Sequence, residues 1–286
     1  MKPKILVQLD TDAQPSVFDS VVAIDSGVDH LLRQGSITPG NVRDRVHGAI
    51  FTRGPADLRS TAIFIGGSDV AAAEAVLGEV RRSFFGPLRV SVMLDPSGAN
   101  TTAAAAVWAA RQHLPLQSST AAVLAATGPV GQRVVRLLAR AGSQVRVASR
   151  SQSKAAAVCD AVRAKFSDAR LTACAAASPE ETAAVLAGAD IVISAGAAGV
   201  QLATHEQLIE VGVRVAIDLN AVPPVGLGGI EATDRAADRK GITAYGALGV
   251  GGVKMKAHKA AIQRLFEAND QILDAEELFE IACSLS

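Results

Sequence analysis

A turn of small residues separates a short apolar run from an amphipathic segment in the middle of the chain, and it reads Ala126-Thr127-Gly128-Pro129-Val130-Gly131. The pattern is GxGxxG with alanine in place of the first glycine. Gly128 allows the backbone to approach a pyrophosphate, and Gly131 allows the following helix to pack on the strand. A helix N-terminus also offers free N–H groups and a positive dipole to phosphate. We therefore predict a nucleotide site, with a tight packing turn as the alternative. The residues expected at the nucleotide are Thr127, Gly128, Pro129, Val130 and Gly131.

The end of the next predicted strand, about 20 residues further on, discriminates between NAD and NADP. Enzymes that use NAD usually carry Asp or Glu there for the ribose 2′-hydroxyl. This chain has Ser149-Arg150-Ser151, with Lys154 one helical turn later. None of these residues repels a 2′-phosphate, and a guanidinium pairs with one. The pattern favours NADP over NAD, and the alternative is that Arg150 is a solvated residue at a helix start.

Three further turns are rich in glycine or polar residues. Ala195-Gly196 follows the apolar run 191–194, Asn220 follows the run 213–219, and Leu248 lies in the glycine-rich stretch 245–252, which is predicted to be flexible. Glycines beside polar residues indicate backbone that lies close to a flat ligand. We therefore add Ala195, Gly196, Asn220 and Leu248 to the expected cofactor residues, with plain turns as the alternative.

The segments around these turns alternate between short apolar runs and helical patterns, which predicts an α/β fold with parallel sheets. The strands are predicted at residues 5–9, 62–65, 90–94, 121–125, 145–148, 191–194 and 213–219. The helices are predicted to open at Pro15 and to occupy residues 70–82, 103–110, 130–140, 154–166, 258–268 and 275–284. We expect Thr101 or Thr102 to cap the helix at 103–110.

Composition limits the class of partner. The 286 residues are 49% hydrophobic and 3% aromatic, and 28 basic and 28 acidic residues give zero formal net charge. The apolar fraction excludes a disordered chain, and the neutral charge argues against a nucleic acid or an anionic membrane as partner. Three scattered cysteines show no zinc-binding spacing, so no metal is expected. The first apolar run is too short for a signal peptide, and we expect a cytoplasmic protein that binds small molecules.

Seven short motifs spread over nearly the whole chain carry a resemblance to a known family. They are residues 8–12 (QLDTD), 15–19 (PSVFD), 51–54 (FTRG), 84–87 (FFGP), 100–102 (NTT), 127–131 (TGPVG) and 246–256. With them the chain resembles the NADP-dependent methylene-tetrahydromethanopterin dehydrogenases of C1-metabolising bacteria, some of which also take NAD. Ala126 stands where these relatives have glycine, and we expect the turn to form because alanine is small.

The resemblance implies an activity and an architecture. N5,N10-methylene-tetrahydromethanopterin would be oxidised to the methenyl cation, with hydride passing to NADP, in formaldehyde oxidation. Two α/β domains would face each other across a cleft, one of them a Rossmann-type doubly wound parallel sheet, in a homo-oligomer (a trimer or hexamer). We assign residues 1–100 and 253–286 to the pterin domain and residues 101–252 to the NADP domain. The alternatives are a methylene-tetrahydrofolate dehydrogenase, with or without cyclohydrolase activity, a shikimate-dehydrogenase-like enzyme and a non-catalytic NADPH-binding sensor.

The implied reaction removes hydride from a carbon between two nitrogens and removes no proton from it, so it requires orientation rather than a catalytic triad or a metal. At the reacting centre we place Phe18, Asp19 and Lys254. We expect substrate contacts from Gln8, Asp10, Asp12, Thr101, Thr102 and Lys256. A protonated lysine opposes the developing cation, so Lys254 is assigned to binding and positioning. For these residues caps, core positions and solvated charges are the alternatives, and His258 is expected to be a surface histidine.

Overall fold

The computed structural model describes residues 2–285, which form two compact units. Unit 1 takes in the described residues up to Thr101 and from Met255 onward, and unit 2 takes in Thr102–Lys254. The chain crosses the boundary inside two helices, α4 (Ala99–Arg111) and α9 (Ala247–Arg264). Each unit is built on its own parallel sheet, which confirms the predicted α/β class.

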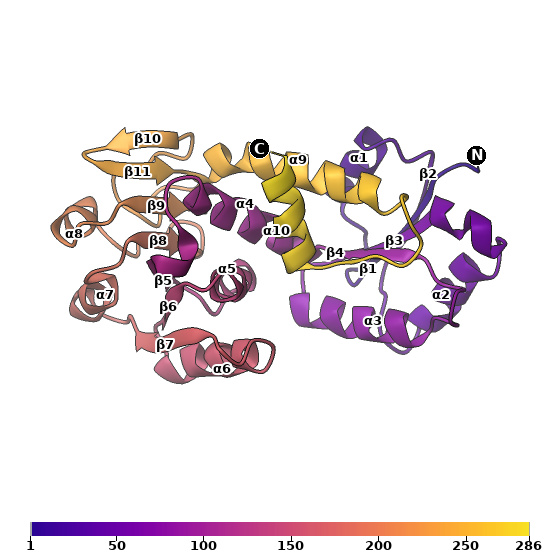
Figure 1. Cartoon of the computed structure of the whole chain (residues 1–286), viewed down its shortest axis with the longest axis horizontal. Coiled ribbons are helices and arrows are strands. Elements are labelled where there is room, and N and C mark those ends of the chain that lie inside the picture. The colour runs from indigo at the N-terminus through magenta and orange to yellow at the C-terminus, as the bar shows by residue number, and fades with distance from the viewer. Residues whose placement is uncertain (1, 286) are drawn as a thin grey trace. The chain divides into compact units, whose positions relative to one another are not determined.

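Unit 1 has a five-stranded sheet in the order β12-β4-β3-β1-β2, and all its neighbouring strands run parallel. The strands are β1 (Ile5–Asp10), β2 (His30–Gln34), β3 (Thr61–Gly66), β4 (Ser91–Leu94) and β12 (Ile272–Leu273). Helices α2 (Val42–Ile50) and α3 (Val70–Arg82) cover one face, and α1 (Val17–Asp25) lies on the other with the end of α9 (Figure 1). The last helix is α10 (Ala275–Ser284).

The apolar runs of unit 1 form its core as expected for buried parallel strands. Every residue of β3 is buried, because helices cover both faces of the sheet. One core cluster joins β1, β3 and β4 to the inner faces of α2 and α3. The helix starts are capped as their sequences suggest, since the Ser16 hydroxyl accepts from Asp19 N and the Asp69 carboxylate accepts from Ala72 N.

Unit 2 has a seven-stranded sheet in the order β10-β11-β9-β8-β5-β6-β7, in which β10 alone runs antiparallel to its neighbour among the described strands. The strands are β5 (Thr120–Leu124), β6 (Gln144–Ser149), β7 (Arg170–Ala175), β8 (Ile191–Ser194), β9 (Val215–Asp218), β10 (Arg235–Arg239) and β11 (Ile242–Tyr245). The six strands from β7 to β11 follow the order 3-2-1-4-5-6 of a doubly wound dinucleotide-binding fold, whose ligand crevice lies where the order reverses, between β5 and β8.

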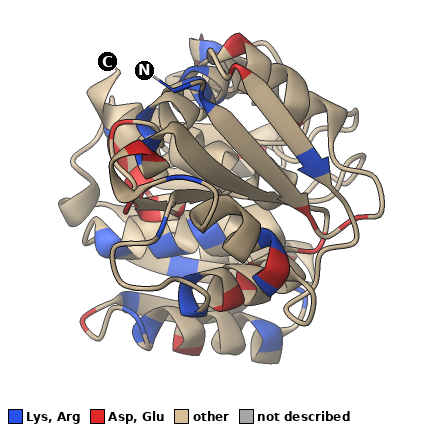
Figure 2. Cartoon of the chain, turned by 90° about the vertical axis from the view of Figure 1, so that its right-hand side faces the viewer, with Lys and Arg blue, Asp and Glu red and all other residues tan. Residues whose placement is uncertain are grey.

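Helices cover both faces of the unit 2 sheet. Helices α5 (Pro129–Arg140) and α6 (Gln152–Arg163) lie on one face, and α7 (Pro179–Leu186) and α8 (His205–Glu210) lie on the other (Figure 1). Three short 3₁₀ turns complete the described elements, at Pro55–Ser60, Pro96–Gly98 and Leu116–Ser118. No helix in residues 2–285 is long and apolar enough to cross a membrane. Lys and Arg lie among Asp and Glu along the helices that Figure 2 shows.

Two local expectations are wrong. The stretch 245–252 is not a flexible loop, because α9 begins at Ala247 and includes its last three glycines. Thr101 and Thr102 do not cap α4 but lie inside it. The carboxylate of Asp95 serves the start of this helix instead, since its Oδ1 accepts from the backbone N–H groups of Asn100 (2.9 Å) and Thr101 (3.1 Å).

Candidate cofactor pocket and strand-end residues

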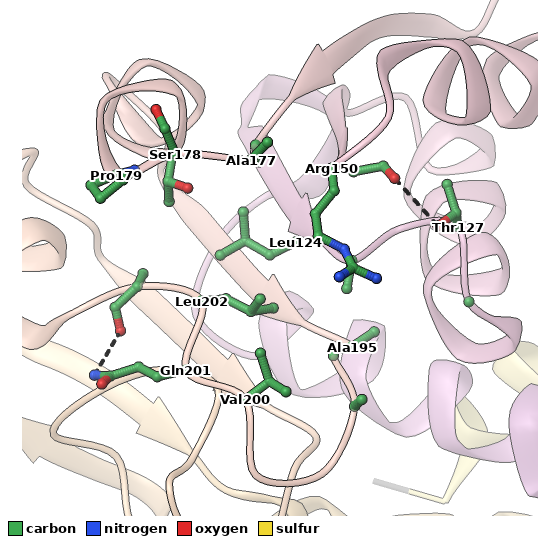
Figure 3. Close-up of a pocket in the computed structure, with 18 of the residues that line it drawn as sticks. Leu124, Thr127, Arg150, Ala177, Ser178, Pro179, Ala195, Val200, Gln201 and Leu202 are labelled. Atoms are coloured by element: carbon green, nitrogen blue, oxygen red, sulfur yellow. Dashed lines mark hydrogen bonds between the residues drawn. The ribbon is translucent and has the colours of Figure 1, made fainter.

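A pocket of about 640 Å³ opens at the carboxyl ends of β5, β6, β7 and β8 (Figure 3). It lies where the strand order predicts a ligand crevice. The structure brings eight of the expected cofactor residues together in its lining, which are Thr127, Gly128, Ser149, Arg150, Ser151, Lys154, Ala195 and Gly196. The expected residues that do not line it are Pro129, Val130, Gly131, Asn220 and Leu248.

The turn after β5 forms with alanine at position 126. Ala126 is fully buried, and its N–H donates to the carbonyl of Ala148 on β6 (2.9 Å). Gly128 stands at the N-cap of α5 and faces the pocket. A Cβ on Gly131 would lie 2.7 Å from the Cα of Ala126, so only glycine lets α5 pack this closely on the turn. Gly131 therefore shapes the site without lining it.

The end of β6 presents hydroxyls, a helix N-terminus and a guanidinium to the pocket. Ser149 Oγ lies 3.5 Å from Thr127 Oγ1 and accepts from Ser151 N (3.3 Å). Ser151 caps α6 by accepting from Lys154 N (3.4 Å). Arg150 extends its guanidinium into the pocket near Thr127 (Figure 3). Among the described residues that line the pocket, Arg150 and Lys154 carry charge and none is acidic, so the site suits an anion.

The opposite wall contains residues that the sequence analysis missed. One group surrounds the start of α7, where Ser178 accepts from Glu181 N (3.2 Å). The other follows β8, where Val200, Gln201 and Leu202 face the cavity (Figure 3). The full set of missed lining residues is Leu124, Ala125, Ala176, Ala177, Ser178, Pro179, Thr182, Ala197, Val200, Gln201, Leu202, Ala203, Thr204 and Gln207. The Ser-Pro-Glu-Glu sequence at 178–181 is typical of a helix start and was the available signal for the first group.

At the carboxyl end of β1, the polar side chains form hydrogen bonds with neighbouring residues of the same loop and of α1. Gln8 is buried, its Nε2 donates to Ser16 O (3.2 Å), and its Oε1 accepts from Ser20 Oγ (2.9 Å). The buried Asp10 carboxylate accepts from the backbone N–H groups of Asp12 (3.0 Å) and Ser16 (3.1 Å). These bonds fold the loop between β1 and α1.

The loops after β1 and β3 meet at Asp12 and Ser68, and Gly66 ends β3 just before this contact. Asp12 accepts from Ser68 N (3.0 Å) and Ser68 Oγ (2.8 Å). A Cβ on Gly66 would lie 3.1 Å from Asp10 Oδ2 and 3.6 Å from Asp19 Oδ2. Two expected carboxylates, those of Asp10 and Asp19, therefore converge on one glycine of β3.

A buried histidine lies beside Phe18. His258 is fully buried, so the expectation of a surface histidine is wrong. Its ring stacks on Phe64 at 5.7 Å and lies 6.5 Å from the ring of Phe18, and its Nδ1 is 3.8 Å from Asp95 Oδ2. The Phe18 side chain is 50% exposed. Phe18 therefore presents one part of its ring to solvent while the rest lies near this buried cluster.

The remaining expected residues lie on α4 and α9. Thr101 is fully buried, and its hydroxyl donates to Asp95 Oδ2 (2.6 Å), while Thr102 is half-buried. Lys254 and Lys256 both lie within helix α9, where residues two positions apart point to different sides. Lys256 is exposed and Lys254 is half-buried. No group of three or more potential metal ligands occurs within the described residues 2–285.

The comparisons with known proteins match both parts of the chain. The family model "Methylene-tetrahydromethanopterin dehydrogenase, N-terminal" matches residues 17–97, and the model "NAD(P)H-binding" matches residues 125–277. The bifunctional protein MdtA of Methylorubrum extorquens is 45% identical over 285 residues, which cover 99% of each chain. The NAD(P)-dependent methylenetetrahydromethanopterin dehydrogenase of the same organism is 29% identical over 297 residues, which cover 100% of each chain.

Two solved structures have a similar fold. Shikimate 5-dehydrogenase from Listeria monocytogenes has a TM-score of 0.56 and 12% identity, with 99% of this chain and 96% of that chain covered. Quinate dehydrogenase from Corynebacterium glutamicum has a TM-score of 0.53 and 14% identity, with 99% of each chain covered. At such low identities these likenesses concern the fold alone.

Proposed function

Since this chain belongs to the methylene-tetrahydromethanopterin dehydrogenase family, we propose that it oxidises N5,N10-methylene-tetrahydromethanopterin to the methenyl form and passes the hydride to NADP. Membership of this family confirms the resemblance carried by the seven motifs and makes the chain an NAD(P)-dependent oxidoreductase. The choice of NADP, the residues that hold each ligand and the place of the reaction in metabolism are our proposals.

One observation supports NADP above the others, the side chains at the end of β6. Ser149, Arg150, Ser151 and Lys154 line one pocket, and no acidic residue is among the described residues of its lining. A 2′-phosphate on the ribose would meet hydroxyl donors, the N-terminus of α6 and a guanidinium. The 2′-hydroxyl of NAD would lack the carboxylate partner that NAD enzymes usually provide. We assign the pyrophosphate to the turn from Thr127 to Gly131.

We assign the pterin to the carboxyl end of the unit 1 sheet. Asp19 is the carboxylate that we propose for the N–H groups of the pterin, and the half-exposed ring of Phe18 is proposed to pack against its face. Gln8, Asp10 and Thr101 are proposed to act indirectly, because their hydrogen bonds shape the loops around the site. Asp12 bonds to Ser68 in the same way, so Thr102 and Lys256 are the candidates for the rest of the substrate.

The reaction sets modest demands on the protein. The nicotinamide ring, when bound, supplies the hydride acceptor. The lone pairs of the two flanking nitrogens stabilise the cation, so the side chains need only orient the substrate and exclude water. Lys254 is proposed to bind and position the substrate, since a positive charge at the reacting carbon would oppose the product cation.

We further propose that the chain works as a homo-oligomer. Val17, Val21 and Ile24 share the exposed side of α1, and Leu32 is exposed on β2, the edge strand of the unit 1 sheet. An apolar helix stripe beside an open strand edge is typical of a buried protein interface. Sedimentation velocity tests this, since Val21→Glu should yield monomers.

We place the reaction in formaldehyde oxidation, because methylene carriers hold carbon at the oxidation level of formaldehyde.

The direct test uses purified protein, NADP and either methylene-tetrahydromethanopterin or methylene-tetrahydrofolate, with NADPH absorbance as the readout. We expect NADPH to form fastest with the methanopterin carrier. Formation with the folate carrier alone would overturn the substrate assignment. Tight NADPH binding without turnover on either carrier would favour a sensor. Hydrolysis of the methenyl carrier to the formyl carrier in the absence of nucleotide would add cyclohydrolase activity.

A further inference from the structure

The glycine-rich loop after β9 lies behind the cofactor pocket rather than in it. Within the part of the chain that the structure describes, residues 219–230 contribute nothing to the pocket lining. The loop instead bonds to the wall formed by Leu202 and Ala203. Both of their backbone N–H groups donate to Gly226 O (2.7 and 3.2 Å), and Gly228 N donates to Ala203 O (2.9 Å). Three backbone hydrogen bonds therefore set the position of this wall.

The loop is in turn held by Asp218, the last residue of β9. Asp218 is 1% exposed, and its Oδ2 accepts from Leu227 N (2.9 Å) while its Oδ1 accepts from Asn220 N (3.1 Å). Burial raises the pKa of the Asp218 carboxyl, and the N–H donors of Leu227 and Asn220 oppose that rise. Asn220 fixes the other end of the loop, since its Nδ2 donates to Pro224 O (3.2 Å).

Gly226 is packed so tightly that this arrangement has no room for a side chain at position 226. A Cβ at position 226 would lie 2.8 Å from Asp218 Oδ1 and would meet Ser194 Oγ. Ser194 is fully buried at the end of β8, and the next residue, Ala195, lines the pocket. A side chain at position 226 must push the loop outward, and the loop carries the carbonyl that holds Leu202 and Ala203.

We propose that Asp218 is a positioning residue for the nicotinamide nucleotide: through Leu227 and Gly226 it fixes the Leu202–Ala203 wall of the pocket and so sets nucleotide affinity without touching the nucleotide. The inference rests on the proposed function, because that function assigns the pocket to NADP. It gives a role to the strand-end carboxylate and the glycine-rich loop on either side of Asn220, which was expected at the cofactor.

The test compares Asp218→Asn with the wild type and with Asp160→Asn, a matched change at an exposed position of α6 in the same unit. The amide keeps one acceptor oxygen but loses the second, so one of the two backbone N–H groups is left buried without a partner. The Kd for NADPH, measured by its fluorescence, should rise about tenfold or more, as expected for the loss of a charge-assisted hydrogen bond. The KM for NADP should rise with it, while kcat at saturating NADP and the KM for the pterin stay near the wild-type values.

Gly226→Ala is the second variant, and it carries the test if Asp218→Asn does not fold. It should weaken NADPH binding in the same way with a cooperative thermal transition retained. NADPH affinity within about twofold of the wild type in a folded variant would overturn the inference. So would a fall in kcat and a rise in the KM for the pterin that are as large as the rise in the Kd for NADPH. A wild type that binds no NADPH would instead contradict the proposed function, so the two failures are distinguishable.

Discussion

The carboxyl ends of the two parallel sheets have similar strand–loop–helix order but use their polar residues differently. In unit 1, the carboxylates of Asp10 and Asp95 accept from backbone N–H groups of the loop or helix start that follows each strand. In unit 2, the ends of β5 and β6 carry Thr127, Ser149 and Arg150 around an open pocket. A strand-end carboxylate that satisfies buried N–H groups holds the loop, whereas hydroxyls and a guanidinium that face open space are available to a ligand.

Asp218 is informative because it lies in unit 2 and behaves like the carboxylates of unit 1. It bonds to backbone N–H groups and lies behind the pocket. The contrast is therefore between side chains that hold loops and side chains that face a cavity, and it is not a property of one unit. Changes of the first kind should reduce stability, and at Asp218 they should reduce nucleotide affinity too, because its loop holds the pocket wall. Changes of the second kind should reduce binding alone.

The largest effect is expected from Asp95→Ala. This substitution leaves two backbone N–H groups and the Thr101 hydroxyl without their buried acceptor. The free energy of unfolding should fall by about 3 kcal/mol or more. Urea denaturation measures it. Ser151→Ala, which removes a single helix cap in unit 2, is the matched control and should cost about 1 kcal/mol. Equal losses in the two variants would contradict the distinction.

The next largest effect is expected from Arg150→Glu, on binding. Reversing the charge replaces the proposed partner of the 2′-phosphate by a group that repels it, so the Kd for NADP should rise about a hundredfold while that for NAD changes little. Calorimetric titration with both nucleotides gives the ratio. Lys165→Glu, a charge reversal at an exposed position after α6, controls for the general electrostatic effect of reversing one charge. Parallel losses for NADP and NAD would remove Arg150 from the 2′-phosphate site.

Phe18→Ala should weaken binding of the substrate and leave binding of the nucleotide unchanged. The ring is half exposed, so its loss should leave the fold intact and raise the KM for the methylene pterin about tenfold, the effect of losing one aromatic contact with a ligand. The Kd for NADPH should not change. Phe85→Ala, the same change at another exposed ring of unit 1, is the comparison, and a similar rise in KM for both variants would show that the effect is not specific to Phe18.

The smallest effect is expected from Asp12→Asn. Its carboxylate is already bonded to Ser68, and the amide can still accept from one of the two donors. Stability should fall by about 1 kcal/mol, and steady-state kinetics should show a nearly unchanged KM for the pterin. A large rise in KM at unchanged stability would instead make Asp12 a direct substrate ligand.

The sequence predicted the fold where local patterns and tertiary packing agree. The uninterrupted apolar run at 62–65 and the capped helix at 70–82 occur as expected in β3 and α3. The exposed edge strand β2 and strand β7 were missed, because an edge strand with few buried residues lacks a continuous apolar run. The predicted start of helix α9, at residue 258, lay too far along the chain, since its glycines at 249, 251 and 252 suggested a loop.

Prediction of the site was limited by a different factor. The turn at residues 126–131 and the Ser149–Ser151 motif can be recognised from residues that are neighbours in sequence, and the structure brings residues of both together in the pocket lining. The roles of Gln8, Asp10 and Thr101 depend on hydrogen-bond partners that the pattern of strands and helices does not specify. His258 shows the same limit, because only the packing of α9 against Phe64 reveals that its ring is buried.

The most direct test of the account is the ratio of kcat/KM for NADP and NAD with methylene-tetrahydromethanopterin as the substrate. The serine-rich end of β6 with Arg150 predicts a preference for NADP of about tenfold or more, since a charge-assisted contact with the 2′-phosphate is available only to NADP. Equal values for the two nucleotides, or a preference for NAD, would contradict the assignment of this pocket.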